Sequence, residues 1–217
     1  MHYHPASLTW ALIELSKNIG VQQRLREELA QIPDRDPTWD ELTNSLPYLD
    51  AVVCETLRLH PPGSETVRQA EVDDIVPLSK PMKDADGQLI DSIFIASGTN
   101  IRIPTASINR SEALWGQDAK VFVPDRWLDG SVSQQLASEI QGHRHILTFA
   151  DGPRTCLGKS FALAEFKAVL SVLIRNFSFE LPDGTHAGFE IHRAILDRPK
   201  VVGRDDDKIP LLVRRVS

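Results

Sequence analysis

The 217 residues are enough for one or two domains and a sizeable hydrophobic core. Hydrophobic residues make up 41% of the chain and charged residues 25%, which is ordinary for a globular protein, and the net charge of −6 implies no nucleic-acid partner. The two cysteines, Cys54 and Cys156, form no Cys-x-x-Cys pair, which excludes a disulfide scaffold and a four-cysteine zinc site.

Helical patterns fill the first part of the chain. Leu8, Leu12 and Leu15 recur at helical spacing and predict a helix over 7–17, and a second helix is predicted over 21–32. The N-terminus lacks the basic segment of a signal peptide, and no apolar run approaches the roughly 20 residues of a membrane span. We therefore expect neither an export signal nor a membrane segment in this chain.

A longer helix is expected from Pro47 to about His60, because the two prolines that follow would stop it. Ahead of it, Thr38 and Glu41 have the spacing of a capping box, which predicts a short helix. Cys54 lies within the longer helix between hydrophobic and acidic neighbours, and we expect it to be a packed core thiol.

The pattern changes to strands between 65 and 104. The segment 84–87 is a turn signal, Asp-Ala-Asp-Gly. β-Branched residues in 88–96 and 100–103 flank Gly98, and this arrangement predicts a hairpin between the two segments.

A turn-rich stretch over 107–126 leads to a short surface helix expected over 133–141 and a long helix expected over 159–176. The long helix carries an apolar stripe at helical spacing, made of Phe161, Ala164, Ala168 and Val172. Short strands are expected to close the chain over 177–181, 200–202 and 211–214.

The most informative stretch runs from Phe149 to Gly158 and reads Phe-Ala-Asp-Gly-Pro-Arg-Thr-Cys-Leu-Gly. Gly158 lets the backbone approach another group closely because glycine has no Cβ. Cys156 lies just ahead of the long helix, at the end where free N–H groups favour negative charge, so a thiolate suits this position. With Arg154 two residues away, the loop suits a metal whose cofactor carries anionic groups. A buried structural cysteine is the alternative.

These ten residues resemble the haem-binding loop of the cytochrome P450 family, Phe-x-x-Gly-x-Arg-x-Cys-x-Gly. All five fixed positions are present: Phe149, Gly152, Arg154, Cys156 and Gly158. The resemblance implies that the chain binds haem b and that Cys156 is the axial thiolate on iron. It also implies insertion of one oxygen atom from O2 into a small lipophilic substrate, with electrons from a flavoprotein reductase. Family habit suggests a role in making lipophilic natural products.

Glu55 and Arg58 lie in a segment, Glu-Thr-Leu-Arg-Leu-His-Pro-Pro, that resembles the Glu-x-x-Arg helix of the family. Arg126, in Pro-Asp-Arg-Trp, resembles the third member of the same network. The resemblance implies a buried glutamate between two arginines, which would fix the fold behind the haem.

Three further residues are candidates for contact with the haem propionates. Arg68 and Arg154 match by position two arginines that have this role in relatives, and the planar guanidinium suits a carboxylate. His145 is close to the loop in sequence and could reach a propionate as well. The haem would carry out the oxidation, so no side chain of the chain is assigned a catalytic role.

The implied fold is mainly α-helical with small β-sheets, and it corresponds to the C-terminal haem-binding half of the cytochrome P450 fold, truncated within the long central helix. Residues 7–18 resemble the last turns of that helix, whereas the family segment that handles O2 just before them has no counterpart here. Many relatives are anchored in the endoplasmic reticulum membrane by a segment not seen in this chain. We expect a single partial domain over 1–217, with a helical part 5–60, a β-rich part 65–104, a meander 107–148, the haem-thiolate loop 149–158, a helix 159–176 and C-terminal strands 177–217.

Three alternatives to a monooxygenase remain open from the sequence. A truncated remnant would bind haem without monooxygenase activity, and a non-haem interaction module would use the same fold without haem. A Cys–His hydrolase would need Cys156 to be activated by a histidine that a third group orients.

Overall fold

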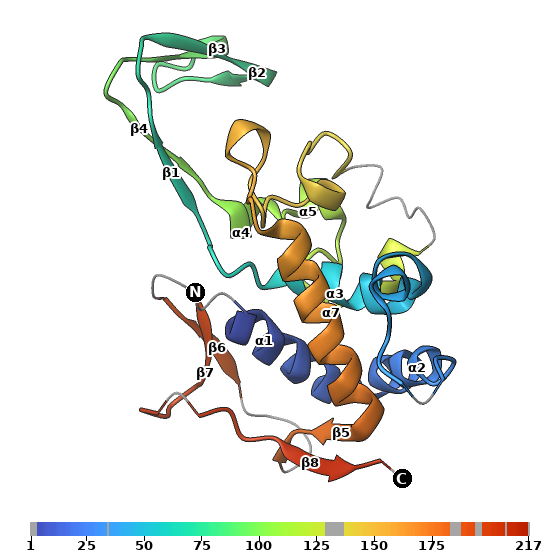
Figure 1. The fold of residues 1–217 in the computed structure, drawn as a ribbon. Coiled ribbons are helices and arrows are strands. Elements are labelled where there is room, and N and C mark those ends of the chain that lie inside the picture. Colours follow the sequence, from blue (N-terminus) through green and yellow to red (C-terminus); the bar gives the residue numbers. More distant parts are fainter. Residues whose placement is uncertain are drawn as a thin grey trace. The chain divides into compact units, whose positions relative to one another are not determined.

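The computed structural model of the chain describes residues 4–33, 35–128, 137–182, 188–193, 197–206 and 208–216 (Figure 1). The chain divides into two compact units. Unit 1 consists of residues 1–64 and 105–217 and holds the helices, while unit 2 consists of residues 65–104 and holds the strands β1 to β4.

The predicted helices of the first part of the chain are present. They are α1 (His4–Lys17), α2 (Ile19–Leu29) and α3 (Pro47–Leu59). The capping box is also present: the Glu41 N–H donates to Thr38 Oγ1 (3.3 Å), and the Thr38 N–H donates to Glu41 Oε2 (2.8 Å). It opens the short π-helix η1 (Glu41–Ser45). The other helical elements are α4 (Thr105–Ile108), α5 (Glu112–Trp115), η2 (Pro124–Trp127), η3 (His143–His145), η4 (Gly152–Arg154) and α7 (Lys159–Asn176).

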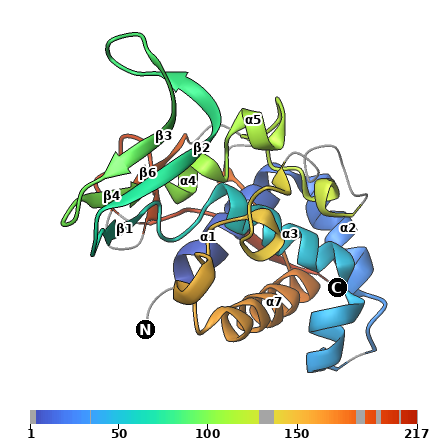
Figure 2. The same cartoon turned by 90° about the horizontal axis from the view of Figure 1, so that it is seen from above.

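The core of unit 1 lies where α1, α3 and α7 pack against one another (Figure 2). Leu15 of α1, Val53 of α3 and Leu170 of α7 are all fully buried there. Burial of one such side chain contributes about 1.5–3 kcal/mol, so the contact between these helices gives unit 1 substantial hydrophobic stabilisation. Phe149, in the segment that leads into α7, packs against this core.

The predicted residues 159–176 form α7, but the predicted apolar stripe is not the face that the helix buries. Of that stripe Ala164 alone is buried, whereas Phe161 and Val172 are 67% and 44% exposed. The buried face includes two polar side chains, Lys167 and Ser171, which donate hydrogen bonds to backbone carbonyl groups. The apolar stripe therefore does not mark the buried face of α7, which has polar side chains at two core positions.

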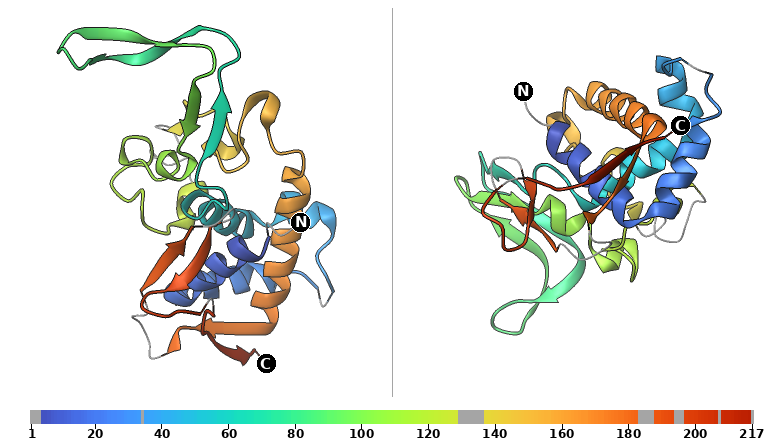
Figure 3. Two further views of the ribbon diagram at one scale, coloured as in Figure 1. Left: turned by 90° about the vertical axis from the view of Figure 1, so that its left-hand side faces the viewer. Right: turned by 90° about the horizontal axis from the view of Figure 1, so that it is seen from below.

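The predicted hairpin across Gly98 is wrong. In unit 2, β2 (Asp74–Lys83) pairs with β3 (Leu89–Ile95), and β1 (Thr66–Gln69) pairs with β4 (Asn100–Ile103), both antiparallel (Figure 3). The segments on the two sides of Gly98 therefore pair with earlier strands and not with each other.

One local turn and one long-range hydrogen bond accompany this pairing. The Asp84 carboxylate accepts hydrogen bonds from the N–H groups of Asp86 (3.0 Å) and Gln88 (2.8 Å), which fixes the β2–β3 turn at the predicted signal. The Gly98 N–H instead donates to the Ala70 carbonyl (2.8 Å), so this glycine joins the end of β1 to the start of β4.

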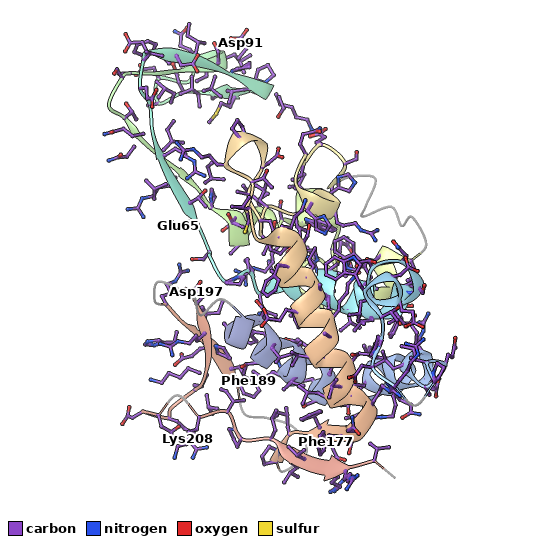
Figure 4. All side chains as sticks on the ribbon, in the orientation of Figure 1. Glu65, Asp91, Phe177, Phe189, Asp197 and Lys208 are labelled. Atoms are coloured by element: carbon purple, nitrogen blue, oxygen red, sulfur yellow. The ribbon has the colours of Figure 1, made fainter. Side chains whose placement is uncertain are left out.

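The C-terminal strands form two further antiparallel pairs, β5 (Phe177–Glu180) with β8 (Leu212–Arg215) and β6 (Phe189–His192) with β7 (Arg198–Val201). Figure 4 labels the first residues of β5 and β6. The three predicted strands lie close to their predicted positions, and β6 is additional. Residues 133–136 of the surface helix predicted over 133–141 lie outside the described residues. No helix in the described part of the chain is long and apolar enough to cross a membrane.

Candidate functional site

The loop from Phe149 to Gly158 lies at the N-terminal end of α7 (Figure 1). Its ends are tied together by a hydrogen bond from the Cys156 N–H to the Phe149 carbonyl (2.9 Å). Between them, the turn η4 is closed by the Thr155 N–H, which donates to the Gly152 carbonyl (3.0 Å). Gly152 has a φ of +66°, a conformation that residues with a Cβ rarely adopt. The turn therefore requires the glycine that the motif supplies.

Cys156 presents a free, exposed thiol just before α7 begins. The Lys159 N–H donates to the Cys156 carbonyl (3.2 Å), so the cysteine is joined to the helix end that favours negative charge. The alternative of a buried structural cysteine is therefore wrong for Cys156. It describes Cys54 of α3, which is fully buried and whose thiol pKa is raised by that burial.

The structure places two of the three candidates for propionate contact in the same unit as the cysteine. Arg154 ends the turn η4 and is exposed, and its guanidinium has no hydrogen-bond or ion-pair partner within the described residues. His145 is half-buried, with Nδ1 at 3.0 Å from the Ile140 carbonyl oxygen, which leaves Nε2 for another partner. Arg68 is exposed on β1 of unit 2, where it donates to the carbonyl of the residue before it (2.9 Å).

Phe149 connects the loop to the core. Its ring packs against the buried core cluster and meets the ring of His143 edge-on, with 6.1 Å between centroids and 75° between planes. Burial lowers the pKa of His143, and the positive charge of Lys159 lowers it further, so the neutral ring is favoured in this contact.

Glu55 of α3 lies at the centre of a buried polar network. Its Oε1 accepts from Arg58 Nη2 (2.9 Å), Arg126 Nε (3.0 Å) and the Val123 N–H (2.9 Å). Its Oε2 accepts from Arg58 Nε (2.8 Å) and Trp127 Nε1 (3.0 Å). The side chains of Glu55 and Arg58 are fully buried and that of Arg126 is 2% exposed, so the charges are shielded from water and depend on one another.

Arg58 uses its remaining donors to hold the chain that follows α4. Its Nη1 donates to the carbonyl groups of Asn109 (2.9 Å) and Ala119 (2.6 Å), and Nη2 reaches that of Val121 (3.3 Å). The guanidinium also lies over the ring of Trp115, 5.0 Å from its centroid. One arginine therefore joins α3 to three points of the segment 109–121.

Asn109 connects this network to the loop 149–158 (the cysteine loop), and no local sequence pattern marks Asn109 as a site residue. Its Oδ1 accepts from the Leu147 N–H (2.9 Å), and its Nδ2 donates to Thr148 Oγ1 (2.9 Å). Thr148 in turn donates to the Leu57 carbonyl of α3 (2.7 Å). Hydrogen bonds therefore hold Leu147 to the buried network and Thr148 to both the network and α3. They fix the position of the backbone where the loop begins.

Comparisons of the sequence with known proteins give the family of the chain. The family model described as cytochrome P450 matches residues 6–201. "Cytochrome P450 monooxygenase claW" of Ampulloclitocybe clavipes is 60% identical over 211 residues, which cover 97% of this chain and 39% of that protein. "Cytochrome P450 monooxygenase 205" of Postia placenta (strain ATCC 44394 / Madison 698-R) is 42% identical over 207 residues, covering 94% of this chain and 37% of that protein. The chain thus spans well under half of the length of these relatives, and it belongs to the cytochrome P450 family.

Proposed function

We propose that the chain is the haem-binding part of a monooxygenase and that Cys156 binds the haem iron as a thiolate. The observation that carries the proposal is the position of Cys156, an exposed free thiol on a loop closed by its own backbone hydrogen bond at the start of α7. The relatives are named cytochrome P450 monooxygenases, which supports the reaction class.

The residues present fit a haem. Within the described residues, no group of three or more histidine, cysteine, aspartate or glutamate side chains could hold a metal ion by itself. A metal bound to Cys156 would therefore take its other ligands from a macrocycle. A Cβ built on Gly158 would meet no atom within 4 Å, and its neighbour Leu157 is fully exposed, so a flat apolar cofactor has room beside the thiol.

A bound haem with a thiolate ligand supplies the O2 chemistry, because the thiolate donates electron density to iron and favours cleavage of the O–O bond. The chain contributes the ligand and its placement. The hydrogen bond from the Cys156 N–H to the Phe149 carbonyl fixes the backbone next to the sulfur, and the Phe149 ring attaches the start of the loop to the core.

The propionates of the haem are proposed to bind Arg154, whose guanidinium is free among the described residues, and His145 through Nε2. Arg68 of unit 2 is proposed as a third partner because it matches the family position. A Cys–His hydrolase is disfavoured, since no histidine of the described residues hydrogen-bonds the sulfur of Cys156.

We also propose that α1 corresponds to the end of the long central helix of the family. The support is the resemblance of residues 7–18 to the last turns of that helix. In the structure, Trp10 of α1 stacks on His60, which follows α3, with 3.9 Å between ring centroids and 4° between planes. Glu14 of the same helix lies 3.1 Å from His60 Nε2. The proposed partners of the whole activity are a small lipophilic substrate, O2 and a flavoprotein reductase.

The test is the absorption spectrum of the chain after haem is added, the iron is reduced and carbon monoxide is bound. We expect the strongly red-shifted Soret band of a thiolate-ligated haem, and we expect Cys156→Ala to lose this band. Cys54→Ala is the matched control, because it removes the buried cysteine and should retain the band. A red-shifted band that persists in Cys156→Ala would show that Cys156 is not the ligand.

Oxygen insertion needs a separate measurement. The haem-loaded chain is mixed with a flavoprotein reductase, its electron source and a lipophilic test substrate, and the oxygenated product is measured. A thiolate band without product would support the haem-binding remnant, whereas absence of haem uptake would support the non-haem interaction module.

A further inference from the structure

Asp50 of α3 joins two cations that lie on opposite sides of the cysteine loop in sequence. Its Oδ1 is 2.6 Å from Lys167 Nζ of α7, and its Oδ2 is 2.6 Å from Arg144 Nη2 of η3. The Lys167 side chain is 6% exposed, and its ammonium also donates to the Leu42 carbonyl (3.0 Å). One carboxylate therefore holds both the turn that precedes the loop and the helix that follows it.

The turn η3 has an unfavourable backbone of its own. Arg144 and His145 have φ angles of 53° and 62°, a left-handed conformation that side chains with a Cβ avoid. The turn is also tight, because a Cβ at Gly142 would overlap the backbone carbonyl of Ile146. Contacts from elsewhere in the fold must keep these residues in place. The ion pair from Arg144 to Asp50 is such a contact, and it comes from one of the two left-handed residues.

Two contacts connect the turn η3 to the cysteine loop. His143 of η3 packs edge-on against the Phe149 ring, and the Phe149 carbonyl accepts the hydrogen bond from the Cys156 N–H (2.9 Å). A shift of η3 away from α3 would therefore move Phe149 and weaken the bond that closes the loop.

We propose that Asp50 is a positioning residue for the cysteine loop, which acts by holding η3 against α3 and α7. Its importance for haem ligation rests on the proposed function of Cys156, whereas its effect on the loop backbone does not require haem. Within the described residues, the Asp50 carboxylate contacts Arg144, Lys167 and the Cys54 thiol but not Cys156, so it acts on the cysteine loop through Arg144, His143 and Phe149.

The test measures hydrogen exchange of the Cys156 amide in the 217-residue chain without added haem. For Asp50→Asn we expect this amide to exchange about tenfold faster or more, because a buried cation loses its partner and the turn loses its anchor. Arg144→Gln removes only the contact to the turn and leaves the pair between Asp50 and Lys167, so it decides the proposal if Asp50→Asn does not fold. Because the Arg144 side chain is 49% exposed, we expect a smaller increase for Arg144→Gln, of about two- to fivefold.

Two controls separate positioning from general stability. Arg144→Lys keeps the charge and should exchange at a rate close to that of the unmodified chain. Arg214→Gln removes an exposed ion pair of the same 2.6 Å length, to Glu180, and should leave the Cys156 amide unchanged. In every folded variant, amides in the middle of α7, such as that of Leu170, should exchange as before.

The proposal is overturned if Arg144→Gln leaves the Cys156 amide unchanged, or if it accelerates the amides of Cys156 and Leu170 equally. A second readout is the carbon monoxide spectrum of the haem-loaded chain, in which Arg144→Gln should lower the share of the thiolate band. If the unmodified chain shows no such band, the haem assignment fails, and the exchange rates still decide the role of Asp50.

Discussion

Replacement of Glu55 by alanine removes the only carboxylate that is fully buried in the network with Arg58 and Arg126 among the described residues. The Arg58 guanidinium would keep its carbonyl partners but lose its counter-charge, and Arg126 would keep Asp118, which is half-exposed. Five N–H donors would lose their acceptor at once.

The magnitude follows from the burial of these groups. Removal of one partner from a buried ion pair destabilises a protein by about 3–5 kcal/mol, because the remaining charge is left without compensation. A native protein is stable by about 5–15 kcal/mol in total, so Glu55→Ala is expected to remove a large part of the free energy of unfolding or to abolish folding.

The assay is urea unfolding followed by tryptophan fluorescence, which suits this site because Trp127 bonds Glu55 and Trp115 stacks under Arg58. Glu180→Ala is the control, since it breaks an exposed pair with Arg214 and should change the free energy of unfolding by less than about 1 kcal/mol. If Glu55→Ala folds and loses no more free energy of unfolding than this control, the buried network does not stabilise the fold.

Two further predictions concern thiol access and pH. In the folded protein at neutral pH, a thiol reagent should label Cys156 and spare Cys54, because burial blocks access to Cys54 and raises the pKa of its thiol. Mass spectrometry of the peptides would measure the labelling of each cysteine. Equal labelling of the two would contradict the burial of Cys54. Burial lowers the pKa of His60 below its ordinary value of 6.5, so the folded state binds fewer protons than the unfolded state, and stability should fall as pH drops from about 6.5 toward the folded-state pKa. The urea midpoint at pH 7.5 and 5.5 measures this loss, which should be smaller in His60→Gln.

The parts of the fold that the sequence predicted well depend on neighbours along the chain. The helix over 47–60, the capping box of Thr38 and Glu41, and the turn at 84–87 each follow from residues within a few positions of one another. The hairpin across Gly98 failed because two equally good strands flank the glycine, and their partners are decided by contacts with strands that come earlier. Local pattern does not contain that choice.

The same limit applies to the candidate site. The motif around Cys156 is contiguous and was identified from its own ten residues. The residues that hold this loop in place are far from it in sequence and were not identified. Thr148 bonds a carbonyl 91 positions away and Arg144 pairs with a carboxylate 94 positions away, and neither residue has a local signal. Asn109 is fully buried, but it lies in a turn-rich segment, where an asparagine normally indicates an exposed turn. The sequence pattern therefore did not indicate its role.

These long-range contacts connect the buried network of Glu55 to the cysteine loop, so a displacement of one should displace the other. From Glu55, one hydrogen bond leads to Arg58, a second to the Asn109 carbonyl, and the Asn109 side chain then holds the backbone just before Phe149. The Asn109 backbone carbonyl accepts from Arg58, and the buried Asn109 side chain bonds Leu147 and Thr148. A displacement of Arg58 would therefore also displace the side-chain contacts of Asn109. A weakened Glu55 network would therefore loosen the start of the cysteine loop before the helices separate. Partial unfolding in urea should accordingly expose the Cys156 amide to exchange earlier than the amides of α7, and simultaneous exposure would show that the network and the loop are independent.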